Sequence, residues 1–184
     1  MTPAALCRLA ALALAGLCLF GCARSAPARF YLLEPVLEAA AVPQPGTCGL
    51  RVDPLPDYLR HPMLATRIGP HEVTYHEYQR WAEHLDQALP AVLAENLARA
   101  LGQTKVWLYP WDTTTPPGRV IRVRIERLDA DPAGRVTLLA LAAEKDVWQR
   151  HAVTVDARSD DPADLVAAQS RALAELASRL AYPD

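Results

Sequence analysis

Cys22 is the residue whose surroundings specify a chemical reaction most clearly. It ends the segment Leu19-Phe20-Gly21-Cys22, and an apolar run of about 12 residues leads up to it from Leu9, directly after the positively charged Arg8. Such a run has the length of a signal-peptide core and is too short to cross a bilayer as a helix. A small residue directly before a cysteine at this place resembles a bacterial lipobox. We therefore expect cleavage before Cys22, a thioether from its thiol to diacylglycerol, and acylation of the new amino terminus by a fatty acid such as palmitate.

The same segment admits one alternative, an ordinary secretory signal peptide that is cut later at an Ala-x-Ala-like site. No better cleavage site lies near Ala26 or Ala28, which favours the lipoprotein. On this interpretation residues 1–21 are the signal peptide, residues 22–28 are a lipidated tether, and residues 29–184 form a single domain. A domain of that length can bury a hydrophobic core of its own.

The lipid anchor also predicts a location. Several fatty chains hold a protein on a membrane far more firmly than a single chain does. In enteric-type bacteria an aspartate directly after the lipidated cysteine retains a lipoprotein in the inner membrane, and this chain has Ala23 there. We therefore expect the protein on the outer membrane, with its domain on the periplasmic side.

Cys48 is the one cysteine that stays available after this processing. Cys7 and Cys18 leave with the signal peptide and Cys22 carries lipid, so no intramolecular disulfide can form. Pairing between subunits and a reactive thiol are two possible states of Cys48. We expect the third, a buried and inert thiol, because free cysteine is among the most buried residue types.

Residues that could carry catalysis do not occur in catalytic patterns. The sequence has no His-x-x-x-His or Cys-x-x-Cys spacing for a metal, no Gly-x-Ser-x-Gly elbow and no phosphate-binding loop. The pairs Asp129/Asp131 and Asp160/Asp161 are expected at turns and at a helix start, where capping explains them. The sequence therefore predicts no catalytic, metal-binding or cofactor-binding residues, and a protein that is not an enzyme.

The charge balance argues against nucleic acid as a partner. The formal net charge is −2, from 19 basic and 21 acidic side chains, and the basic residues are scattered singly along the chain. Nucleic-acid binding requires a concentrated basic patch.

Apolar residues at every fourth position predict a long helix from Trp81 to Leu101, ended by Gly102. Pro90 lies inside it and removes one backbone hydrogen bond, so we expect a kink or a break near Gln87. Strands are predicted by alternating or aromatic apolar runs. They are expected over residues 29–33, 48–55, 64–68, 72–75, 104–108, 120–128, 136–144 and 147–155.

A second helix is expected from Asp160-Asp161 onward, with Pro162 in its first turn. This order of elements predicts an α/β (α+β) fold, with a mixed, largely antiparallel sheet of five to seven strands and two main helices packed on it. The helix residues expected to face the core are Leu85, Leu93, Leu97, Leu173, Leu176 and Leu180.

Aromatic residues form the clearest candidate contact surface. Trp107-Leu108-Tyr109-Pro110-Trp111 enters a proline-rich loop, and prolines bracket a bend over Asp57-Tyr58-Leu59-Arg60. These side chains either pack in the core and anchor loops, or form a contact surface for a protein partner or a lipid. We predict that Trp107 lies in the core and that Tyr58, Leu59 and Trp111 contact a partner.

Six segments, in order along the chain, carry a family resemblance. They are the lipobox at Cys22, Phe30-Tyr31-Leu32-Leu33, Val52-Asp53-Pro54-Leu55-Pro56-Asp57-Tyr58-Leu59-Arg60-His61-Pro62, Arg80-Trp81-Ala82-Glu83-His84-Leu85, Leu93-Ala94-Glu95-Asn96-Leu97-Ala98 and Ser170-Arg171-Ala172-Leu173-Ala174-Glu175-Leu176. Together they resemble the PqiC/YmbA family, auxiliary lipoproteins of ABC-type transport systems that carry MCE (mammalian cell entry) proteins.

The resemblance implies an outer-membrane lipoprotein with a mixed α/β fold. Its partners would be a periplasmic MCE-domain protein and the inner-membrane permease complex of a system that moves lipids between membranes and protects membrane integrity. The chain would dock the periplasmic component without catalysis, as a single copy or as a homo-oligomeric ring. A lipoprotein of an envelope assembly or secretion apparatus, of the lipopolysaccharide or curli export type, is the alternative.

Overall fold

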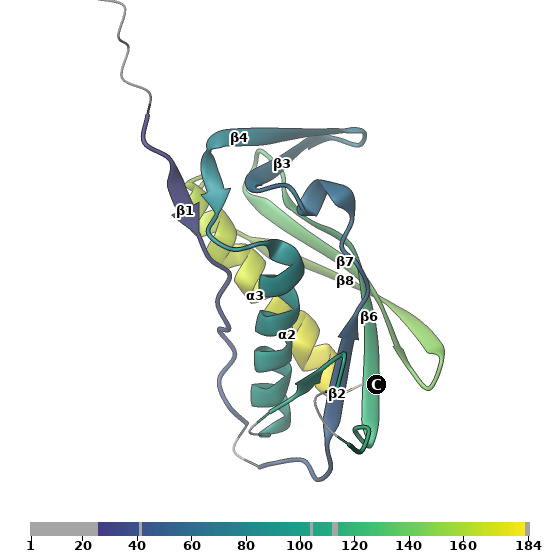
Figure 1. Cartoon of the computed structure of the whole chain (residues 1–184). Helices are drawn as coiled ribbons and strands as arrows, with labels where there is room; N and C mark the ends of the chain where they lie inside the picture. Colours follow the sequence, from purple (N-terminus) through teal and green to yellow (C-terminus); the bar gives the residue numbers. More distant parts are fainter. Residues whose placement is uncertain (1–25, 41, 104, 112–113, 183–184) are drawn as a thin grey trace, which may run out of the picture.

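The computed structural model describes residues 26–40, 42–103, 105–111 and 114–182 (Figure 1). The strands are β1 (Arg29–Tyr31), β2 (Cys48–Val52), β3 (Met63–Gly69), β4 (Glu72–Trp81), β5 (Trp107–Leu108), β6 (Arg119–Ala130), β7 (Arg135–Glu144) and β8 (Val147–Asp156). The helices are α2 (Leu85–Leu101), α3 (Pro162–Ala181) and the short 3₁₀ helix η1 (Asp57–Leu59).

All eight strands belong to one mixed sheet, so the predicted fold class is confirmed, with more strands than the expected five to seven. The order is β1-β4-β3-β6-β2-β5, and β7 and β8 extend the sheet from the other side of β6. β6 is long enough to pair with β2 along its first half and with β3 at Ala130. The β6–β7–β8 meander and the β3–β4 hairpin are antiparallel, whereas β1, β2 and β5 pair in parallel.

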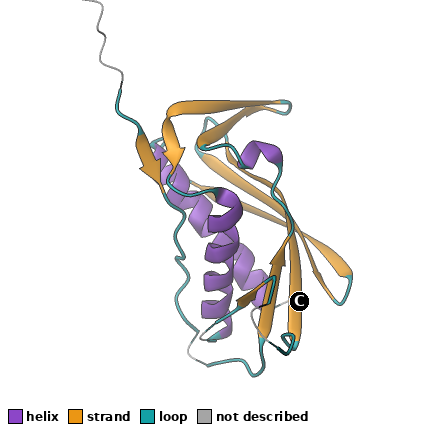
Figure 2. Cartoon of the chain, in the orientation of Figure 1, coloured by secondary structure: helices purple, strands orange, loops and turns teal. Residues whose placement is uncertain are grey.

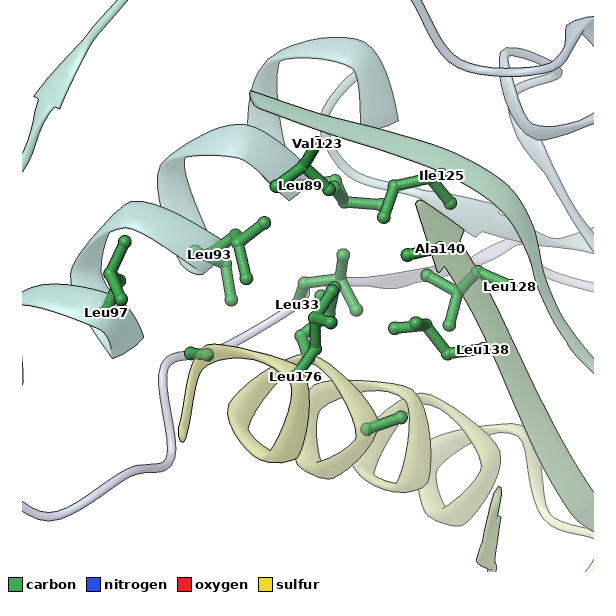
Figure 3. Packing of buried hydrophobic residues seen from close by; sticks show 14 of the residues in the cluster. Leu33, Leu89, Leu93, Leu97, Val123, Ile125, Leu128, Leu138, Ala140 and Leu176 are labelled. Carbon is green, nitrogen blue, oxygen red and sulfur yellow. The ribbon is translucent and has the colours of Figure 1, made fainter. Parts of the chain in front are cut away.

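Both long helices pack on the same face of the sheet and against each other (Figure 2). The close view shows leucines of α2 and Leu176 of α3 meeting the apolar side chains of β6 and β7 (Figure 3). Each of the six helix leucines predicted to face the core is at most 5% exposed. The stripe of apolar side chains therefore predicts the buried face of both helices correctly.

α2 begins at Leu85 and not at Trp81, which is the last residue of β4. The spacing of Trp81 to the helix leucines is a coincidence, because the chain turns between strand and helix at His84, the N-cap. The helix continues through Pro90 without the predicted break. Since α2 starts later than predicted, the missing proline N–H falls in its second turn, where it leaves only one carbonyl without its helical partner.

Two polar side chains of the helices hold the segment that connects β1 to β2. The backbone N–H groups of Val36 and Leu37 donate to Oδ1 of Asn96 at 3.1 and 3.0 Å, and Asn96 is fully buried. The N–H of Glu34 donates to Oγ of Ser170 at 3.2 Å. These contacts attach the segment that follows β1 to α2 and α3.

Candidate partner-contact surface

Cys22 and the rest of the predicted lipobox lie outside the described residues. Among the residues that are described, no helix has the length and apolarity that crossing a membrane requires. The described chain enters the domain through β1, which lies at the edge of the sheet beside β4.

Tyr58 anchors the predicted bend to the sheet through its hydroxyl group. The hydroxyl donates to Oδ2 of Asp129 at 2.9 Å and accepts the backbone N–H of Leu128 at 3.1 Å. Burial raises the pKa of Tyr58 to about 12; the Leu128 hydrogen bond lowers it, and the nearby Asp129 carboxylate raises it further. Tyr58 is therefore a neutral, half-buried side chain whose polar atom is engaged inside the protein.

Asp129 is a buried carboxylate in β6, and its predicted role as a turn cap is wrong. It accepts hydrogen bonds from Arg67 at 3.0 and 3.2 Å, from Arg127 at 2.8 Å and from Tyr58. Asp129 pairs with Thr137 of β7 in the ladder that continues after a register shift between Ile125 and Arg127, so it belongs to the strand and not to the turn that follows. The four side chains form a charged cluster that locks the bend onto the sheet, because a fully buried carboxylate requires such partners.

Leu59 is 4% exposed and packs in the hydrophobic core. The accessible side chains of this region are different ones: Tyr75 stacks on the His61 ring with 4.2 Å between ring centroids and donates to the Tyr58 carbonyl. The structure thus places Tyr58 and Leu59 where they hold the bend. A direct contact with a partner stays a prediction for both.

Trp111 lies over Gly49 on the face of the sheet opposite the helices. A Cβ atom at Gly49 would come within 2.8 Å of the Trp111 ring and of Pro117, so only glycine leaves room for this packing. Cys48 and Leu50 point into the core, which places Gly49 on the opposite face of β2. Tyr109 meets the Trp111 ring edge-on at 5.4 Å between centroids and is 52% exposed.

Trp107 is only partly buried and lies on the same outer face, because it pairs with Gly49 across β2 and β5. The predicted core position of Trp107 is therefore wrong. The ammonium group of Lys105 covers its ring at 3.7 Å from the centroid. Trp107 and Trp111 flank Gly49 on the face of the sheet opposite α2 and α3.

Three arginines on the outer face continue this surface and were not singled out from the sequence. Arg51 of β2 lies over the Tyr109 ring at 4.7 Å, and Arg122 and Arg124 of β6 lie over the Trp148 ring at 5.2 and 5.5 Å. Their alternation with buried residues is visible in the sequence. Their proximity to the aromatic loop, residues 109–111, is not visible in the sequence, because it depends on the pairing of β2 with β6.

Cys48 is 1% exposed, in agreement with the predicted buried thiol. Burial raises the pKa of Cys48 from 9.0 to about 11, against the opposing effect of the Arg119 charge. The folded state holds the thiol proton more tightly than the unfolded state does, so this group contributes stability below about pH 9 that is lost as the pH rises through 11.

We expect iodoacetamide to leave Cys48 unmodified in the folded protein at neutral pH, because alkylation requires an accessible thiolate. Mass spectrometry across a urea series checks this, and modification should follow the unfolding transition. Rapid alkylation before unfolding would assign Cys48 to the reactive alternative.

Among the described residues, no three His, Cys, Asp or Glu side chains gather as a metal ion would require. The organised surface features are instead the anchored bend and the outer face with its stacked cations.

A family model described as the ABC-type transport auxiliary lipoprotein component matches residues 31–181. The chain belongs to this family. The PqiC/YmbA-type resemblance that the six sequence segments carry is thereby confirmed. As an auxiliary lipoprotein, the protein is a membrane-anchored component of the cell envelope and serves an ABC-type transport system.

Two solved structures are similar to this chain in fold. One, described as an uncharacterized protein, is 17% identical with a TM-score of 0.65, over 85% of this chain and 97% of the other. The second is a protein from Xanthomonas campestris assigned to the family DUF330; it is 18% identical with a TM-score of 0.65, over 84% and 93% of the two chains. Among curated proteins, none matches the sequence.

Proposed function

We propose that this auxiliary lipoprotein is anchored to the periplasmic side of the outer membrane and docks the MCE-domain protein of an ABC-type intermembrane lipid transport system. Residues 1–21 are its signal peptide, residues 22–28 its lipidated tether and residues 29–184 its single periplasmic domain. It acts by binding and positions the transport machinery, and it performs no catalysis.

The observation that carries this proposal is the separation of tether and contact surface. The described chain enters through β1 at the upper end of Figure 1, whereas β2 lies toward the lower end. β5 and the aromatic loop that follows it pair with β2 and pack on it, through Trp107 and Trp111. A membrane-anchored adaptor needs this polarity, because its anchor and its binding surface must face in opposite directions.

The length of the tether supports the same arrangement. Seven residues, 22–28, span at most about 25 Å when fully extended. The domain therefore stays close to the membrane that holds the lipid. A partner that begins at the inner membrane must come to the domain across the periplasm, as an MCE-domain protein does.

Replacing Cys22 by alanine is expected to abolish labelling by a fatty-acid probe and to release the protein from the membrane fraction. The thioether cannot form without the thiol, and the described domain has no spanning helix that could replace the anchor. Density-gradient separation of the wild-type membranes, followed by immunoblotting, should find the protein with the outer membrane. Labelling that survives in Cys22→Ala would contradict the anchor assignment.

Co-purification tests the docking function. The wild-type chain, extracted from membranes in mild detergent, should recover the MCE-domain protein of the same cell. Trp111→Ala should reduce that recovery in a protein that thermal unfolding shows to be folded. Tyr78→Ala, which changes an exposed tyrosine on β4 beside the tether end, should not reduce it. Recovery of export or assembly proteins instead would favour the secretion-type alternative.

A further inference from the structure

The outer face of the sheet carries four stacked cations in one continuous group. We define the cation–aromatic row as these residues: Lys105, Trp107, Tyr109, Arg51, Arg122, Trp148 and Arg124. Each cation of the row lies over an aromatic ring, at 3.7 to 5.5 Å from the ring centroid. The row crosses the sheet from β5 to β8.

Strand register explains how residues far apart in sequence come together here. Arg51 is the direct neighbour of Arg122 across β2 and β6. Arg122 is opposite Ala143 of β7, and Ala143 is opposite Trp148 of β8. Because alanine fills little space between them, the Trp148 ring reaches across β7 to the guanidinium of Arg122.

Two features of the row are unfavourable for the stability of the sheet. Like charges directly opposite each other on neighbouring strands are destabilising, and Arg51 and Arg122 are in that relation. Nε of Arg122 is buried and has no hydrogen-bond partner among the described residues. A local conflict of this kind, retained on an uncovered face, is typical of a functional site.

The row has an excess of positive charge. Of its four cations, Arg124 pairs with Asp53 at 3.1 Å and Arg122 with the highly exposed Asp146 at 3.4 Å. Arg51 and Lys105 have no carboxylate within 4.0 Å in the part of the chain that the structure describes. Two cations are therefore held in place by rings while their charge is available to a ligand.

We infer that the cation–aromatic row is the docking surface for an acidic segment of the partner protein. A guanidinium stacked on a ring keeps its N–H edge free for carboxylates, and the ring restricts its motion before binding. Aromatic and arginine side chains also dominate the binding energy of protein interfaces. The row lies away from β1 and the tether, which favours a protein segment over lipid headgroups. The inference rests on the proposed function only for the identity of the protein that carries this segment.

A short oligo-glutamate peptide is a direct probe of the row. It should change the tryptophan fluorescence of the full lipidated chain in detergent, because Trp107, Trp111 and Trp148 all lie at the row, and its binding should weaken as salt is added. Arg51→Glu should weaken binding roughly tenfold, as expected for an interface anchor. Lys105→Glu should act in the same direction.

Arg158→Glu is the matched control, since Arg158 is exposed and precedes α3, on the side of the domain near β1. It should leave the affinity unchanged, and thermal unfolding should show that all three variants are folded. Equal affinities of the Arg51 and Arg158 variants, no binding by the wild type, or equally tight binding of oligo-lysine would overturn the inference. Absence of the MCE-domain protein from the co-purification would instead contradict the proposed function. It would not affect the inference that the row binds an acidic segment, which the peptide measurements test.

Discussion

Replacing Asp129 by alanine is expected to lower the free energy of unfolding by about 3–5 kcal/mol. The substitution removes a fully buried carboxylate and leaves Arg67, Arg127 and the Tyr58 hydroxyl without their common acceptor. The cost comes mainly from these two arginines, which lose their counter-charge although water reaches only part of each side chain. Urea unfolding followed by circular dichroism measures the change.

Asp156→Ala is the control for this substitution. Asp156 pairs with Arg135 at 3.1 Å, but its side chain is 75% exposed, so water replaces the lost contact and we expect little change. An Asp129→Ala variant as stable as Asp156→Ala would show that the charged cluster does not hold the bend.

Leu176→Ala is expected to cost about 2–5 kcal/mol of unfolding free energy. Leu176 is fully buried where α3 meets the sheet (Figure 3). The cavity left by its side chain cannot collapse, because α3 is packed against α2 and the strands β6, β7 and β8. The unfolding midpoint in urea, at an unchanged slope, measures the loss of stability.

Leu32→Ala is the matched control, because it makes the same chemical change at a leucine that is 45% exposed. Its midpoint should stay close to that of the wild type. If both leucine variants behaved alike, the assignment of the α3 stripe to the core would be contradicted.

Local signals predict the helices and strands of this protein well. Asp161 accepts the N–H of Ala163 at 2.8 Å at the start of α3, as the Asp-Pro pair predicts. Gly102 ends α2 with a φ of 62°, a conformation that glycine adopts without strain. The predicted helix begins too early because the spacing of Trp81 fits the helix period even though the residue ends a strand.

The contact surface was only partly predictable, for a physical reason. The aromatic loop is visible in the sequence, but its neighbours depend on the parallel pairing of β2 with β5 and β6. Arg51 and Tyr109 are distant in sequence, and their stacking follows from that register. The sequence predicts a turn at Asp129 because the residues after it form one, whereas its pairing with Thr137 of β7 places it inside the strand.

The most direct test of the account is photo-crosslinking in intact cells. A crosslinking amino acid at Tyr109, which is exposed within the row, should capture the MCE-domain protein, and mass spectrometry should place the crosslink in an acidic segment of that protein. The same substitution at Tyr78, which is exposed on β4 beside the start of β1, should not capture it. Capture from Tyr78 but not from Tyr109, or crosslinks from Tyr109 only to lipid or to a second copy of the chain, would contradict the proposed docking role.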